Sequence, residues 1–131
     1  MTHNAPTTEL IFVGTGTSSS LPNVNCLTQP PDGKQCKTCL STLAPEGKKN
    51  VRRNTSAVVR IDGKDDRKIT IVIDAGKTFQ AAAVEWFPKF KLRRIDALLL
   101  THAHADAMNG LDDLRVLARW AKAYSESHID V

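Results

Sequence analysis

The chain has 131 residues, a length that corresponds to one domain with a single hydrophobic core. Hydrophobic residues make up 41% of the sequence and charged residues 24%, which is typical of a globular protein and excludes a disordered one. No stretch approaches the roughly 20 apolar residues of a membrane span, and the N-terminus lacks the pattern of a signal peptide. We therefore expect a cytoplasmic protein, or a nuclear one, that does not contact membranes.

The hydrophobic pattern predicts alternating strands and helices after a short disordered tail at 1–8. In chain order the predicted elements are strands at 9–13, 55–61 and 68–74, a helix at 78–90 that ends near Pro88, a strand at 95–101 and a helix at 109–124. These elements form one domain at 9–131. Trp86 and Phe87 are expected in its core.

Residues 21–50 show no hydrophobic periodicity and contain four of the six prolines, which predicts an irregular insertion. The insertion holds all three cysteines of the chain, Cys26, Cys36 and Cys39. An odd number of cysteines argues against a complete disulfide framework, and a C-x-x-C turn lets two thiolates bind one ion. A structural zinc is the favoured interpretation. Free thiols and a redox C-x-x-C stay open, although a redox motif opens a helix and no helical pattern follows here.

The strongest functional signal is Thr-His-Ala-His-Ala-Asp at 101–106, directly after the last predicted strand. His102, His104 and Asp106 are two residues apart, so on an extended backbone their side chains point the same way. Imidazole nitrogens and carboxylate oxygens are ligands of catalytic zinc. Asp74 ends an earlier strand at the same predicted sheet edge, where it would support the metal ligands. The alternative is a structural pair of histidines.

These residues resemble the metallo-β-lactamase superfamily. The resemblance rests on Phe-Val-Gly-Thr-Gly at 12–16, the three cysteines, Asp-Ala-Gly at 74–76 and Thr-His-x-His-x-Asp at 101–106, in that order. More narrowly, the chain resembles the phosphodiesterase branch, which includes cyclic-phosphate phosphodiesterases of phosphonate breakdown, tRNase Z endonucleases and the pyrroloquinoline-quinone biosynthesis protein B group. The resemblance implies an α/β fold: the N-terminal half of an αββα sandwich, with a mixed β-sheet and two helices on one face.

The resemblance also implies a role for each matching residue. His102 and His104 would bind the first metal ion, and Asp106 would bind a second ion or orient the attacking water. Asp74 would brace the metal-binding loop. The catalytic site would hold one or two zinc or manganese ions, and the three cysteines would form a separate structural zinc site with a fourth ligand from elsewhere.

The chain departs from the family pattern in two places. Ala107 stands where the family has a further histidine, so a second ion lacks one ligand. Asp112 or Asp113 would be substitutes, although ordinary surface charges are the simpler interpretation. The family's later ligands, which lie in a second half, have no counterpart before Val131.

These features predict a metal-dependent hydrolase, in particular a phosphodiesterase that uses metal-activated water on a cyclic phosphate, nucleotide or RNA-type substrate. The net charge of +4 suits such phosphate-bearing substrates. Two alternatives remain open: an inactive fragment that binds a metal or a partner, and one chain of a split enzyme. A homo-oligomer or a complementing C-terminal half would then complete the sheet.

Overall fold

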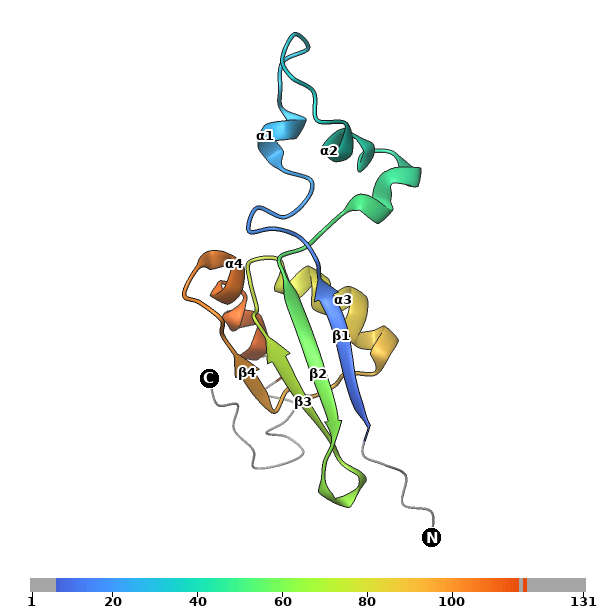
Figure 1. Cartoon of the computed structure of the whole chain (residues 1–131), viewed down its shortest axis with the longest axis vertical. Coiled ribbons are helices and arrows are strands. Elements are labelled where there is room, and N and C mark those ends of the chain that lie inside the picture. The colour runs from blue at the N-terminus through green and yellow to red at the C-terminus, as the bar shows by residue number, and fades with distance from the viewer. Residues whose placement is uncertain (1–6, 116, 118–131) are drawn as a thin grey trace.

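The computed structural model describes residues 7–115 and 117, and its centre is a four-stranded sheet (Figure 1). The strands lie side by side in the order β1 (Thr8–Gly14), β2 (Ser56–Asp62), β3 (Lys68–Ile73) and β4 (Ala97–Leu99). β1–β2 and β2–β3 are antiparallel, whereas β3–β4 is parallel. The predicted α/β fold with a mixed sheet is therefore confirmed, and β1, β3 and β4 all end at the same edge.

The two faces of the sheet are both apolar but differ in burial. Successive side chains of a strand alternate between faces, so residues paired across the sheet share a face. One such row is fully buried and forms the core: Ile11, Val58, Val72 and Leu98. The next row points to the opposite face and ends in two exposed residues, Phe12 and Leu99, with Ala57 and Ile73 between them.

The buried face is covered by α3 (Phe79–Phe90), which lies behind the sheet in Figure 1. Phe79, Ala82 and Phe87 face the core, and the rings of Phe79 and Phe87 meet edge to face at 6.0 Å. The helix runs two residues beyond Pro88, where the sequence predicted its end. Proline lacks an amide donor and disturbs the preceding turn, and α3 ends at Phe90, two residues after Pro88.

The insertion stands apart from the sheet at the top of Figure 1 and is more regular than predicted. It contains α1 (Val24–Leu27), α2 (Lys37–Ser41) and the 3-10 helix η1 (Pro45–Asn50). Elements of four to six residues are too short for a hydrophobic period to register in the sequence. The expectation that no helix follows the C-x-x-C is wrong, because Cys36 is the N-cap of α2.

The chain after β4 also differs in detail from its prediction. β4 ends three residues before His102, and Leu99 and Leu100 are exposed instead of buried. α4 (Ala105–Met108) precedes the predicted helix at 109–124, and the 3-10 helix η3 (Leu111–Asp113) lies within that range, followed by helical backbone at Leu114 and Arg115. The rest of the predicted range, apart from Leu117, lies outside the described residues. Leu111, Leu114 and Leu117 pack with the cluster under α3, on the same face of the sheet.

No helix in the part of the chain that the structure describes is long and apolar enough to cross a membrane.

Candidate metal centre

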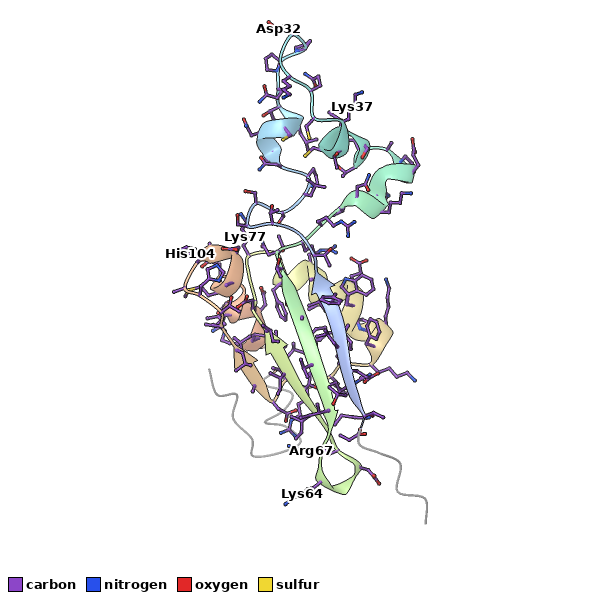
Figure 2. All side chains as sticks on the ribbon, viewed as in Figure 1. Asp32, Lys37, Lys64, Arg67, Lys77 and His104 are labelled. Atoms are coloured by element: carbon purple, nitrogen blue, oxygen red, sulfur yellow. The ribbon has the colours of Figure 1, made fainter. Side chains whose placement is uncertain are left out.

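The predicted metal ligands follow the strand ends at one edge of the sheet. Asp74 comes directly after β3, and the loop with His102 and His104 follows β4, the parallel neighbour of β3. Open sheets bind ligands beyond the carboxyl ends of their parallel strands. Figure 2 shows His104 at this edge, next to the insertion and opposite the hairpin of Lys64.

The structure brings His102, His104 and Asp106 together. One ligand atom from each lies within 4.8 Å of the other two, and the two imidazole rings meet edge to face with centroids 4.9 Å apart. Nε2 of His102 is 3.5 Å from Oδ1 of Asp106. Two ligands of a tetrahedral zinc, each about 2.1 Å from the ion, lie roughly 3.4 Å apart. The donor set and its spacing therefore fit a zinc-sized ion, and both histidines are exposed, as an open site requires.

A hydrogen-bonded chain fixes the orientation of His102. Asp74 accepts from the amide of Thr101 (2.8 Å) and from its hydroxyl (2.6 Å). A carboxylate only accepts, so the Thr101 hydroxyl proton points to Asp74 and its oxygen is left to accept from Nδ1–H of His102 at 2.9 Å. The lone pair of Nε2 then faces the metal site. The contact of Asp74 with the histidines thus runs through Thr101, a residue that sequence reasoning did not assign, and the supporting role predicted for Asp74 stays a prediction.

Asp74 itself has an unusual backbone. Its φ is 57°, in the left-handed region that residues other than glycine rarely adopt. The side chain is 7% exposed, its amide donates to Leu99 (2.9 Å), and its carbonyl accepts from Ser56 Oγ (2.8 Å). Such strain persists where the surroundings over-determine the conformation, most often at functional sites. Here it turns the carboxylate back toward residues 101–107, the segment after β4 that carries the predicted ligands and enters α4. We call this segment the metal loop.

The metal loop is tied to the turn after β3 through the backbone. Ala75 donates to the carbonyl of Ala107 (2.7 Å), and Lys77 donates to that of Ala105 (3.2 Å). At Gly76 the two segments touch, because a Cβ there would lie 1.9 Å from the carbonyl oxygen of Asp106. Only glycine allows this approach, which explains the Asp-Ala-Gly sequence in physical terms.

The three cysteines form a second cluster, in the insertion. Cys26 comes from α1, Cys36 caps α2 and Cys39 lies within α2, and their sulfur atoms are all within 4.8 Å of one another. Thiolates at about 2.3 Å from a tetrahedral zinc lie about 3.8 Å apart, so a small contraction would let all three bind one ion. The described residues supply three ligands and no fourth.

Hydrogen bonds within the cysteine cluster separate the thiol pKa values. The pKa of Cys26 is raised to about 11, first by its hydrogen bond with Cys39 and then by burial. The pKa of Cys36 is lowered, first because the backbone amide of Cys39 donates to its sulfur. Cys36 thus loses its proton more readily than an ordinary thiol, whereas Cys26 keeps its proton until a metal ion displaces it.

The structure does not bring the predicted substitute ligands into the histidine cluster. Asp112 is exposed and pairs with Arg115 (2.8 Å), as the simpler interpretation expected. Asp113 lines a separate pocket along α3, together with Phe79 and Leu117. Ala107 is 1% exposed in α4. Among the described residues, a second ion next to the first would have Asp106 as its ligand.

Comparison with known proteins agrees with this architecture. The model of the β-lactamase superfamily domain matches residues 69–130. The crystal structure of a diphosphatase of the PhnP family matches with a TM-score of 0.64 and 26% identity, over 95% of this chain and 39% of that one. The fold therefore matches part of the metallo-β-lactamase superfamily fold, and the superfamily's domain model covers residues 69–130 of this chain.

Two further proteins match this chain. Zn²⁺-bound PqqB from Methylobacterium extorquens has the same fold, with a TM-score of 0.57 and 20% identity over 83% of this chain and 34% of that one. An octanoyltransferase of Porphyromonas gingivalis is 33% identical over 122 residues, which are 91% of this chain but 20% of that protein. The chain therefore spans a fifth of this curated relative and less than two fifths of the solved structures.

Proposed function

We propose that the chain carries the metal-binding core of a metal-dependent phosphodiesterase. The observation that supports this most is the exposed cluster of His102, His104 and Asp106, held at the strand ends by Asp74 and Thr101. When bound, the ion supplies an activated water near neutral pH and positive charge beside the phosphate oxygens. Zinc fits the two imidazoles and one carboxylate best, and manganese is the alternative.

Each residue of the cluster has a separate task in this proposal. His102 and His104 hold the ion through neutral imidazole nitrogens, and Thr101 keeps Nε2 of His102 free for it. Asp106, with 24% of its side chain exposed, either completes the ligand set or accepts a proton from the attacking water. Asp74 touches neither the ion nor the substrate and acts by positioning Thr101.

A phosphate-bearing substrate, either a small molecule or an RNA-type chain, is supported by the charge near the cluster. Lys77 follows the Asp-Ala-Gly turn, is exposed, and is bonded through its amide to Ala105 in the metal loop. Figure 2 shows Lys77 and His104 at the same edge of the sheet. An ammonium group here would attract and orient a phosphodiester anion. Lys64 is an exposed lysine in the hairpin at the opposite end of the sheet, far from the histidine cluster.

The test is hydrolysis of bis(p-nitrophenyl) phosphate and of a 2′,3′-cyclic nucleotide by the chain loaded with zinc or manganese. We expect measurable turnover by the parent chain. The variant His102→Ala/His104→Ala should lose this turnover and should also bind about one equivalent of metal less than the parent chain. Lys77→Ala should raise KM about tenfold, whereas Lys64→Ala should leave it unchanged. A chain that retains its metal at the histidines and hydrolyses neither ester would overturn the proposal.

A second candidate function, binding to a partner chain, is favoured by the open face of the sheet. Leu10, Phe12 and Leu99 are each more than half exposed on it, and contiguous apolar surface marks interaction sites. A second copy or a complementing chain would cover this face. Activity that rises with protein concentration faster than linearly would support this function, and constant specific activity of a monomer would count against it.

A further inference from the structure

A cavity beside β1 has no place in the proposed hydrolase. It measures about 620 Å³ and lies between the end of the insertion, the end of β1 and the middle of α3. Pockets for small molecules commonly measure about 300–1,000 Å³, so the cavity has the size of a ligand site. Its walls include four cationic side chains: Lys48 and Lys49 of η1, and Arg52 and Arg53 of the segment that leads into β2.

The charge of these walls is unbalanced. Glu85 is the carboxylate that lines the cavity, and it pairs with Arg53 and with Lys89. Lys48, Lys49 and Arg52 have no carboxylate partner among the described residues. The Arg52 guanidinium is held instead by the hydroxyl of Thr15, at 3.0 Å. Three cations that line one concave surface create a positive potential, which favours an anionic ligand.

Apolar rings complete the lining. Phe12 and Trp86 both border the cavity, and Phe12 is 62% exposed. The ammonium group of Lys89 lies over the Trp86 ring at 4.3 Å, which holds the indole in place. Exposed aromatic rings beside cations are the combination that binds a nucleobase together with its phosphates. A purely inorganic anion would make no use of them.

We propose that this cavity binds a nucleoside diphosphate. The three cations without a carboxylate partner match the roughly three negative charges of a diphosphate, and the Trp86 ring on α3 provides an aromatic surface for the base. The cavity borders β1, whereas the metal loop follows β4, three strands away. At about 4.8 Å between strands the two sites are roughly 14 Å apart, so this site is separate from the metal centre and does not depend on the proposed function.

The test is a calorimetric titration with ADP of His102→Ala/His104→Ala loaded with one equivalent of zinc, so that the histidine cluster contributes nothing and the insertion keeps its ion. We expect one saturable site. Lys48→Glu/Lys49→Glu should weaken ADP binding by about tenfold or more, and the matched pair Lys34→Glu/Lys64→Glu, at exposed lysines outside the cavity, should change it by less than about twofold.

Tryptophan fluorescence provides an independent measurement if the charge-reversed variant does not fold. ADP should quench the emission of the parent chain and lose this effect in Trp86→Phe, which retains Trp120 as its other tryptophan. The proposal is overturned by the absence of saturable ADP binding, by equal weakening in the control pair, or by quenching that persists without Trp86. Inorganic phosphate that competes as well as ADP would refute recognition of the base. A short single-stranded RNA that binds more than about tenfold tighter would assign the cavity to a nucleic acid strand instead.

Discussion

The histidine cluster and the cysteine cluster offer three ligands each, but the rest of the molecule supports them very differently. The metal loop is fixed to β3 by the carboxylate of Asp74 and by backbone bonds from Ala75 and Lys77. The cysteine cluster sits in an insertion whose one buried hydrophobic side chain is that of Cys39. The comparison teaches that protein contacts build the histidine cluster before any ion binds, whereas the cysteine cluster depends on its ion for its own structure.

The largest expected effect follows from this difference. Removal of zinc, or Cys36→Ser/Cys39→Ser, should unfold the insertion, because a small segment without an apolar core takes its folding free energy from the metal. Amide hydrogen exchange should lose protection in α1 and α2 while β2 and β3 keep theirs. His102→Ala/His104→Ala is the matched control and should leave the insertion protected. Equal protection of α1 and α2 with and without zinc would contradict the claim that the insertion depends on its ion for its structure.

The next effect concerns the backbone contact that fixes the metal loop. Gly76→Ala should cost more than about 2 kcal/mol of stability and shift the loop, because the new Cβ meets the carbonyl of Asp106. Urea unfolding and a zinc titration would measure the two consequences. Gly33→Ala is the control, since its Cβ would lie 3.0 Å from the flexible end of Gln29 and 3.1 Å from the carbonyl oxygen of Pro30, without the 1.9 Å overlap found at Gly76. Normal stability of the Gly76 variant would mean that the close approach is not real.

A smaller effect is expected from Thr101→Val. The substitution removes the hydroxyl between Asp74 and His102 but retains the shape of the side chain. Loss of such a supporting hydrogen bond lowers metal affinity about 10–100-fold, and the folded state should be little changed. Competition with a zinc chelator would measure the affinity. Thr8→Val in β1 is the control and should have the zinc affinity of the wild type. Unchanged zinc affinity in Thr101→Val would contradict the proposal that Thr101 sets the tautomer of His102.

The last effect is the pH dependence of zinc binding by the cysteine cluster. The raised pKa of Cys26, about 11, means that zinc must displace a proton from this thiol at neutral pH. The affinity should therefore rise with pH, by about tenfold per unit for each proton released, between pH 6 and 8. Titration of the His102→Ala/His104→Ala variant isolates this cluster. A flat profile would contradict the protonated state of Cys26.

The sheet and the grouping of the two clusters could be predicted from the sequence because both depend on short-range patterns. Alternation and β-branching identify β2 and β3, and the spacing of His102, His104 and Asp106 is a local property of the backbone. The elements of the insertion were missed because four or five residues carry no period. Capping chemistry at Asn23, whose side chain accepts from Asn25, was the one local signal for α1.

The supporting residues could not be predicted because their roles arise in three dimensions. Thr101 lies 27 residues from Asp74, and only the parallel pairing of β3 and β4 brings them together. The basic cavity likewise joins residues from β1, η1 and α3. Lysines and arginines in the sequence were indistinguishable from ordinary surface charges, and Trp86 was expected in the core, which it contacts while also lining the cavity.

The central claim is that His102 and His104 hold a metal ion independently of the cysteines. Zinc-edge X-ray absorption of Cys26→Ser/Cys36→Ser/Cys39→Ser, loaded with one equivalent of zinc, tests it most directly. The account predicts nitrogen and oxygen ligands near 2.0–2.1 Å with the outer-shell scattering of about two imidazoles. A variant that retains no zinc, or whose spectrum lacks imidazole scattering, would contradict it.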